Sequence, residues 1–406
     1  MKYNTIIIGG GTAGLMCAYQ LEEANIDYVV LEKNDSLGKK LLLTGGTRCN
    51  VTNNLDTSSF ISSLTIPHRR FLYSSLSDFN TKDIIKFFND NGCSLVLNEG
   101  FKYFPKSYKS IDVLKVFIEK ISKNRIILNS NVTKIAKNNE LFVVQSGSQI
   151  YQATNVVIAT GSKSFPKTGS CGDGLEFAKM LGINYFDFTP AETNVFSRQV
   201  VNELADLQGF SFKNINVSIK NTNIKTQGDV LFTHFGLSGP AIMHLSEYIF
   251  DYLKEGNVTL KLPLTNSTQE EINSLFIEAR EKNFSLLKTL EKLTTKKIAK
   301  ILIDQLSIEE KNFADLNKRH ILSIKEKLLG YDITVDNVLD VTKAYVNKGG
   351  IDTKELSPKT MEVKSVTNLY FIGETVDLHG PIGGFNITIA FCTAVSAAKD
   401  IIKKNH

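Results

Sequence analysis

A glycine-rich turn close to the N-terminus constrains the fold more than any other feature of the chain. Residues 6–14 read Ile-Ile-Ile-Gly-Gly-Gly-Thr-Ala-Gly, a G-x-G-x-x-G pattern that follows an apolar strand at 3–8 and opens an amphipathic helix. In such a turn Gly9 allows the tight bend, Gly11 lets the backbone approach a pyrophosphate, and Gly14 lets the helix pack on the strand. The spacing predicts a dinucleotide-binding βαβ unit.

The second strand of this unit, at residues 28–32, ends in an acidic residue. Glu32 stands 18 residues after Gly14, where a carboxylate accepts hydrogen bonds from a ribose diol. An acid at this place argues against a ribose that carries a 2′-phosphate. The motif alone leaves NAD and FAD open, since both contain the same ADP half.

Composition places the chain among ordinary globular proteins. Its 406 residues, 42% of them hydrophobic, are too many for one small module and predict more than one core. A net charge of +5 is too mild to indicate a nucleic-acid or membrane partner. Five cysteines without a C-x-x-C pair predict a reduced, cytoplasmic protein with neither a disulfide framework nor a metal site. The longest apolar stretch, 5–21, is broken by glycines, so we expect no membrane span.

The pattern of apolar residues divides the chain into four segments. Residues 1–190 have α/β character, 191–265 are rich in short strands, 266–335 are helical, and 336–406 return to α/β. Between 281 and 330 lysine and arginine outnumber acids by 11 to 7. This makes the helical segment the expected basic region, which we interpret as a solvated face.

Two late segments favour FAD over NAD. The apolar strand 156–159 ends in Thr160-Gly161, and the strand 369–372 is followed by Gly373 and Glu374. In two-part flavoproteins such a glycine-acid pair lies by the ribityl chain, and the next helix N-terminus faces the pyrimidine oxygens of the flavin. The glycine-rich segment 380–386 fits this last role.

Four further segments, 38–41, 44–53, 232–240 and 358–362, together with 380–386, resemble the BaiN-like (YhiN-like) NAD(P)/FAD-dependent oxidoreductases. The resemblance implies a discontinuous Rossmann-like FAD-binding domain with an inserted β-barrel-like plus helical domain. It also implies that the loop after Glu32 wraps the cofactor and that the backbone of Val132 contacts adenine. Thr47 departs from the family, which usually has glycine there, and would be strained at a positive φ.

The motifs and the resemblance together define the expected FAD contacts. Lys40 and Arg48 are expected to face the pyrophosphate or the flavin, where reduction develops negative charge. The full expected set is Gly9, Gly11, Thr12, Ala13, Gly14, Glu32, Lys33, Gly38, Lys40, Thr44, Gly46, Arg48, Asn50, Val132, Thr160, Gly161, Gly373, Glu374, Asp377, Gly384, Phe385, Asn386 and Ile387.

The predicted function is an FAD-dependent oxidoreductase that takes hydride from NAD(P)H and reduces a small organic substrate of the enone type. A flavin-dependent oxidase or monooxygenase without a nicotinamide donor is one alternative, and a flavin-binding protein that interacts with RNA is another. Nucleic acid is not the expected partner, because no aromatic residues interleave the basic segment. His379 and His234 are the candidate proton donors, His68 is expected at the surface, and the oligomeric state is not predicted.

Overall fold

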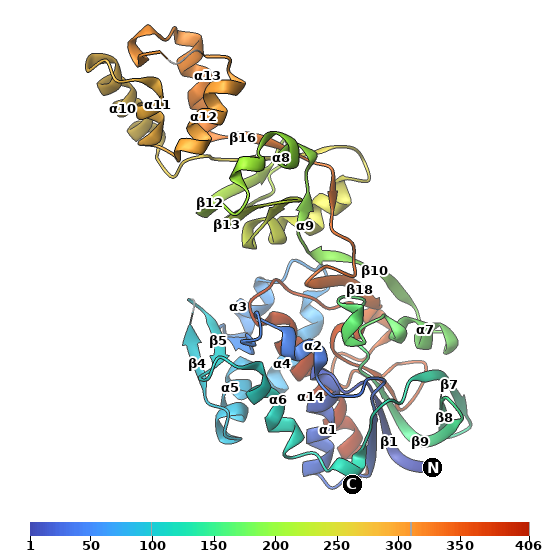
Figure 1. The fold of residues 1–406 in the computed structure, drawn as a ribbon. Coiled ribbons are helices and arrows are strands. Elements are labelled where there is room, and N and C mark those ends of the chain that lie inside the picture. The colour runs from blue at the N-terminus through green and yellow to red at the C-terminus, as the bar shows by residue number, and fades with distance from the viewer. Residues whose placement is uncertain (99, 309–310, 406) are drawn as a thin grey trace. The chain divides into compact units, whose positions relative to one another are not determined.

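A computed structural model describes all residues except 99, 309–310 and 406. The chain forms two compact units, 1–189 with 341–406 and 190–340. The first unit therefore contains both ends of the chain, the blue and the dark red elements of Figure 1. The boundary expected at 335 falls a few residues short of the one in the structure.

A mixed sheet of seven strands forms the centre of the first unit. Its parallel part joins β1 (Lys2–Ile8), β2 (Tyr28–Leu31), β9 (Gln149–Ile158) and β19 (Leu369–Phe371). β2 and β19 are continuous apolar runs, and so are the last three residues of β1 and of β9, as strands buried on both faces require. The register pairs Ile8 with Leu31 and with Ile158, and Ile158 with Phe371. All four carboxyl ends consequently meet at one edge of the sheet.

An antiparallel extension continues the sheet beyond β9. It consists of β7 (Val132–Asn138) and β8 (Leu141–Ser146), as the alternating pattern predicts. The segment 125–128, expected to belong to this meander, instead supplies β6 (Ile126–Ile127), which pairs in parallel with β2. The short apolar run of β6 suits a parallel edge strand as well as an antiparallel one, so the pattern could not separate the two.

Two helices from opposite ends of the chain pack against each other beside the sheet, α1 (Thr12–Glu23) and α14 (Phe385–Asn405) (Figure 1). One helix among the described residues, α14, is long and apolar enough to cross a membrane by length and composition alone, but 72% of its apolar window is buried within the protein. Such burial is typical of the core helix of a globular unit.

The remaining elements of the first unit surround this core. A small sheet has the order β3-β5-β4, and β10 pairs with β18 in another. Their bounds are α2 (Lys39–Leu43), β3 (Thr52–Asn53), α3 (Thr57–Ser62), α4 (Tyr73–Asp78), α5 (Thr81–Asp90), β4 (Leu95–Asn98), β5 (Lys102–Pro105), α6 (Ser110–Ile118), α7 (Asp173–Met180), β10 (Tyr185–Glu192) and β18 (Val346–Ile351).

The second unit combines an antiparallel sheet with helices. The sheet has the order β16-β15-β12-β13-β14-β11-β17. Residues 331–335, expected within the helical segment, form a strand in which alternate residues such as Ile333 and Val335 are buried. The bounds are β11 (Val195–Phe196), α8 (Arg198–Glu203), β12 (Ser211–Ile219), β13 (Lys225–Thr233), β14 (Gly236–Ser238), α9 (Pro240–Tyr252), β15 (Val258–Leu262), α10 (Gln269–Glu281), α11 (Leu286–Glu291), α12 (Lys296–Gln305), α13 (Lys318–Leu329), β16 (Tyr331–Val335) and β17 (Asn337–Val338).

Candidate functional site

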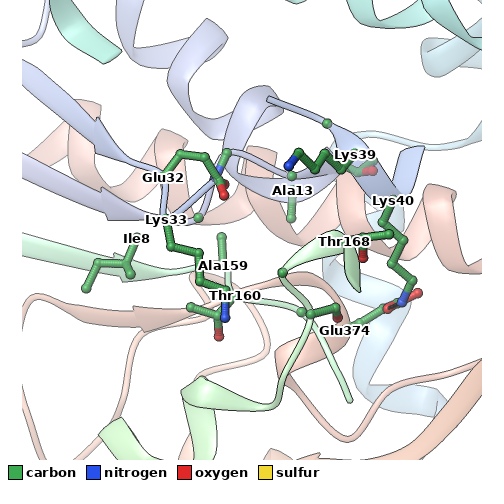
Figure 2. Close-up of a pocket in the computed structure, with 18 of the residues that line it drawn as sticks. Ile8, Ala13, Glu32, Lys33, Lys39, Lys40, Ala159, Thr160, Thr168 and Glu374 are labelled. Atoms are coloured by element: carbon green, nitrogen blue, oxygen red, sulfur yellow. Dashed lines mark hydrogen bonds and ion pairs between the residues drawn. The ribbon is translucent and has the colours of Figure 1, made fainter. Parts of the chain in front are cut away.

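A pocket opens at the carboxyl ends of the parallel strands of the first unit (Figure 2). This edge is where open α/β sheets bind their ligands. The residues from our expected set that line it are Gly9, Gly11, Thr12, Ala13, Glu32, Lys33, Gly38, Lys40, Thr44, Val132, Thr160, Gly161, Glu374, Asn386 and Ile387. Segments more than 300 residues apart in sequence thus contribute to one wall.

The glycine turn has the geometry that the G-x-G-x-x-G spacing requires. Gly9 has a φ of +107°, and a Cβ on Gly14 would lie 1.9 Å from the carbonyl oxygen of Gly9. A Cβ on Gly11, by contrast, would meet no described atom within 4 Å. Gly11 is the N-cap of α1, and no described side chain caps the helix there. The first amides of α1 are therefore available to an anion in the pocket.

Glu32 is the acidic member of the site and is almost fully buried. Its Oε2 accepts the backbone N–H of Gly10 at 2.7 Å. Its Oε1 accepts the backbone N–H and the side-chain amide of Asn34, at 2.8 and 2.7 Å. These three bonds fix the carboxylate in the pocket wall. Carboxylate oxygens have lone pairs beyond these, so Glu32 can also accept a pair of ribose hydroxyls.

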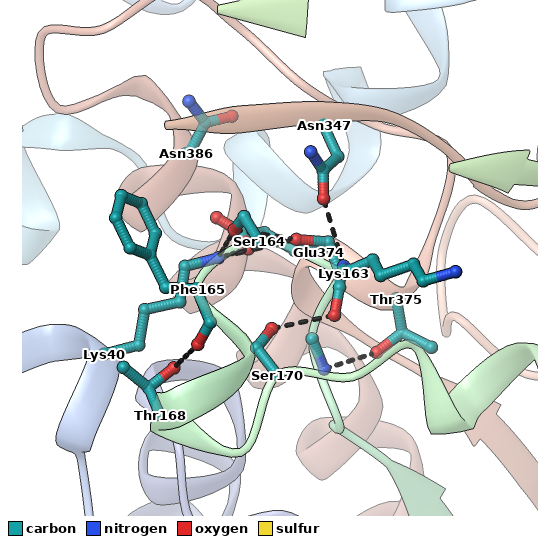
Figure 3. Close-up of polar contacts among 12 residues, drawn as sticks. Lys40, Lys163, Ser164, Phe165, Thr168, Ser170, Asn347, Glu374, Thr375 and Asn386 are labelled. Carbon is teal, nitrogen blue, oxygen red and sulfur yellow. Dashed lines mark hydrogen bonds and ion pairs between the residues drawn. The ribbon is translucent and has the colours of Figure 1, made fainter. Parts of the chain in front are cut away.

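Lys40 and Glu374 form an ion pair at the opposite wall (Figure 3). The Lys40 Nζ lies 2.5 Å from a Glu374 oxygen and 2.5 Å from the Ser164 hydroxyl, and Ser162 also donates to Glu374 at 3.1 Å. About a quarter of each charged side chain is exposed. The pair joins α2 to the segment after β19, and it leaves both charges within reach of a ligand.

The sequence reasoning missed a second glycine loop of the pocket. Thr168, Gly169, Ser170 and Asp173 line it, although we had not assigned the glycine-rich run 169–174 a role. Asp173 pairs with Lys33 at 2.5 Å and so attaches this loop to the end of β2. The glycine-rich run before α7 could have indicated this loop, but its glycine spacing does not match the dinucleotide-binding motif G-x-G-x-x-G.

The other expected contacts lie outside the pocket wall. Gly14, Gly373 and Gly384 allow close packing, since a Cβ there would approach Gly9, Ala13 and the backbone of Thr52 within 3 Å. The exposed side chain of Arg48 stacks over the Phe104 ring at 5.1 Å rather than facing the pocket. Gly46, Asn50, Asp377 and Phe385 also do not line the pocket. A direct contact between these residues and a cofactor stays a prediction.

Thr47 has a φ of +71°, the left-handed conformation that we expected to strain it. A β-branched residue is a true outlier there, at a cost of roughly 1–3 kcal/mol. We expect Thr47→Gly to stabilise the protein by about 1 kcal/mol, because the relief of strain exceeds the entropy that glycine adds to the unfolded chain. Thermal unfolding would show a melting temperature roughly 2–4 °C higher. Thr47→Ala keeps the positive φ strained, so an equal gain in that variant would contradict this explanation.

The histidines are placed differently from our expectations. His379 is 4% exposed on the loop before α14, whereas His234 is exposed at the turn between β13 and β14 of the second unit. His68, expected at the surface, is half-buried, because its Nε2 contacts the backbone oxygen of Asp377 and lies 3.6 Å from the Asp377 carboxylate. Asp377 in turn accepts the N–H of Gly349 at 3.0 Å. His68 therefore anchors the loop that carries His379.

All five cysteines are described and none is in a disulfide; Cys171 is exposed and the other four are buried. Burial raises the pKa of the Cys17 and Cys49 thiols to about 12, and that of Cys93 to about 11. We expect a thiol-specific chromogenic disulfide to titrate one thiol per native chain rapidly and all five in denaturant. Fast reaction of a second native thiol would contradict the burial of the other four cysteines.

The pocket also fits a dinucleotide by its hydrogen-bonding capacity. Among the described residues, the Thr160 hydroxyl in the pocket wall is buried and has no hydrogen-bond partner. A buried polar atom of this kind is costly unless a ligand or water satisfies it. Together with the free amides of α1 and the fixed carboxylate of Glu32, it matches the phosphate and ribose groups of FAD.

Comparison with known proteins decides the family. The sequence profile of the HI0933-like protein Rossmann domain matches residues 3–400. The chain belongs to this family. HI0933-like proteins are FAD-dependent oxidoreductases with a Rossmann-type cofactor domain, and both statements hold for this chain. The resemblance to BaiN-like proteins is thereby confirmed.

Two relatives of the HI0933-like chain cover it almost completely. The "Ribosomal RNA dihydrouridine synthase" of Haemophilus influenzae is 31% identical over 98% of each chain. The "3-dehydro-bile acid delta(4,6)-reductase" of Clostridium scindens is 25% identical over 97% of each. Among solved structures, a 3-ketosteroid-Δ4-(5α)-dehydrogenase from Rhodococcus jostii superposes with a TM-score of 0.53 at 12% identity, covering 99% of this chain and 97% of that one. This last likeness concerns the fold alone.

Proposed function

We propose that the protein is an FAD-dependent reductase of a carbon–carbon double bond conjugated to a carbonyl, and that its substrate is a uridine of ribosomal RNA. The observation that supports this most strongly is the full-length similarity to a ribosomal RNA dihydrouridine synthase, combined with a pocket that is lined by the glycine turn, Glu32 and Glu374. Nucleic acid was not the expected partner, and the name of this relative weighs against that expectation.

The two relatives share one kind of chemistry. Dihydrouridine differs from uridine by saturation of the C5–C6 bond, which is conjugated to the C4 carbonyl. The bile-acid reductase, by its name, acts on double bonds at positions 4 and 6 of a 3-oxo compound. Both reactions add a hydride to an electron-poor carbon and a proton to its neighbour. A small conjugated ketone, our first expectation, is therefore the second candidate substrate.

FAD, when bound, supplies a carrier that accepts a hydride from NAD(P)H and delivers it to the substrate double bond. The residues of this chain bind and orient that carrier. The amides of Gly11, Thr12 and Ala13 would hold the pyrophosphate, and Glu32 would hold the adenosine ribose. Asn386, whose side-chain amide ties it to Gly380 through two hydrogen bonds of 2.9 and 2.8 Å, fixes the start of α14 at the other end of the pocket.

His379 is the proposed proton donor to the carbon that does not receive the hydride. It is buried on the loop between Asp377 and Asn386, which the contact of His68 with Asp377 holds in place. Removal of a general acid typically lowers the rate of the chemical step by about 100-fold or more. For His379→Gln we expect this loss in product formation with unchanged FAD content.

The test is to incubate the FAD-loaded protein anaerobically with ribosomal RNA free of dihydrouridine, adding NADH or NADPH. Mass spectrometry of the nucleosides then measures dihydrouridine, and a parallel reaction contains a 4-ene-3-oxo steroid instead of RNA. We expect dihydrouridine at a defined position with one of the two nucleotides, and little steroid reduction. Reduction of the steroid but not of the RNA would show that the substrate is a small molecule. Activity that requires oxygen would favour a monooxygenase. NAD(P)H as donor and the cytoplasm as location stay predictions.

A further inference from the structure

The excess of positive charge lies in the first unit of the protein and not in the second unit, which contains the helical segment. Residues 33–125 carry 15 Lys and Arg against 8 Asp and Glu, whereas the second unit, 190–340, carries 18 against 20. Within 102–125 the ratio is 7 to 2. This corrects our expectation that the segment 281–330 is the most basic, because its excess is balanced by acids elsewhere in the same unit.

Part of this charge forms one continuous surface, which we call the basic rim: Arg48, Lys106, Tyr108 and Lys109. All four are exposed. Arg48 stacks over Phe104, whose ring centroid lies 5.8 Å from that of Tyr108. The turn that carries Lys106 and Tyr108 is closed by the N–H of Tyr108, which donates to the oxygen of Pro105 at 2.8 Å. The rim therefore combines three cations with an exposed aromatic ring.

The basic rim is directly connected to the pocket wall. Thr44 lines the pocket, and the loop 44–48 leads from it to Arg48, a distance of at most about 14 Å along an extended chain. The carbonyl of Thr47 accepts the N–H of Ser110 at 2.8 Å, which attaches this loop to the segment after Lys109. A ligand on the rim would thus extend to the mouth of the cofactor pocket.

Two properties of the rim distinguish it from a merely solvated face. Neither Lys106 nor Lys109 forms a salt bridge with a described residue, although many surface lysines of this chain do. Tyr108 has a φ of +55°, a strained conformation for a bulky residue, and the residue is 37% exposed. Two exposed lysines that form no salt bridge with a described residue, beside an exposed tyrosine, match a single-stranded nucleic acid, which offers phosphates and stackable bases.

We propose that the basic rim binds the RNA strand next to the uridine that is reduced. This inference rests on the proposed function, and it adds the place where the RNA docks. A uridine must leave its stack to reach a buried cofactor, so the enzyme has to hold the flanking strand while the base is turned out. Arg48, Lys106 and Lys109 would contact the phosphates, and Tyr108 would stack on a neighbouring base.

The test measures binding of a fluorescent, uridine-rich single-stranded RNA of about 12 nucleotides by anisotropy over a series of salt concentrations. For the Lys106→Gln, Lys109→Gln double variant of the FAD-loaded protein we expect roughly 10-fold weaker binding and a salt slope smaller by about 1.4, because two phosphate contacts are lost. Tyr108→Ala is expected to weaken binding about 10-fold without changing the salt slope. FAD content confirms that each variant is folded.

The matched control is Lys296→Gln, Lys297→Gln, which removes two exposed lysines from α12 of the second unit. We expect this control to bind RNA like the unchanged protein. Equal losses in both double variants, or a loss in the control alone, would overturn the inference. If the unchanged protein makes dihydrouridine and the rim variants bind RNA normally, the proposal that the basic rim binds RNA is wrong, and the proposed function stands. If binding depends on the rim but no dihydrouridine forms, the proposed function fails and the rim is supported.

Discussion

Alanine at Gly14 is expected to abolish FAD binding and to destabilise the first unit. The added methyl would lie 1.9 Å from the carbonyl oxygen of Gly9, a backbone atom that cannot move without opening the turn between β1 and α1. Overpacking of this kind costs about 3 kcal/mol or more when backbone must shift. We expect FAD affinity to fall by more than about 100-fold, measured as FAD retained per chain and by isothermal titration.

Gly11→Ala is the matched control in the same turn. A Cβ on Gly11 meets no described atom within 4 Å, and its φ of −85° suits any residue. The thermal stability of the FAD-free protein should therefore be unchanged, while the methyl, which faces the pocket, should weaken FAD binding. If Gly11→Ala retains FAD fully, the pyrophosphate does not lie against this turn, and the assignment of the pocket is wrong.

Glu32→Ala is expected to have the second largest effect. The substitution leaves the buried N–H of Gly10 without its acceptor, which costs about 1–3 kcal/mol in the FAD-free protein. A loss of about 2 kcal/mol lowers the melting temperature by roughly 4–8 °C. Loss of the ribose contact should add a decrease in FAD affinity of roughly 10- to 100-fold.

Glu23→Ala provides the comparison for this variant. Glu23 ends α1 in the same βαβ unit, but it is exposed. We expect its replacement to change neither FAD affinity nor stability measurably. A Glu32 variant that loses stability but keeps FAD affinity would show that the carboxylate supports the turn and does not hold a ribose.

The sequence predicted those parts of the site that depend on local geometry. The spacing of Gly9, Gly11 and Gly14 after an apolar strand has few structural solutions, so the turn, the helix and the acid at Glu32 follow from it. The contribution of Glu374 to the pocket could also be predicted, because a glycine-acid pair after a late strand is typical of flavoproteins. The positive φ of Thr47 was predictable because the family usually has glycine at this position.

The parts that could not be predicted depend on contacts between distant segments. The charge of Lys40 suggested a phosphate ligand, but its pairing with Glu374 depends on how two loops 334 positions apart meet. The contact of His68 with Asp377 and the stacking of Arg48 on Phe104 have the same origin. Periodicity also assigned residues 331–335 to the helical segment, although their pairing with β15 makes them a strand.

The most direct test of the central claim, reduction of an RNA uridine at this FAD site, is a single-turnover reaction that needs no nicotinamide. The FAD-loaded protein is reduced stoichiometrically with dithionite under anaerobic conditions and mixed with ribosomal RNA that lacks dihydrouridine. Recovery of the flavin absorbance near ~450 nm is followed, and dihydrouridine is counted afterwards. Our account predicts reoxidation with one dihydrouridine formed per flavin oxidised. A flavin that stays reduced with RNA present would contradict it.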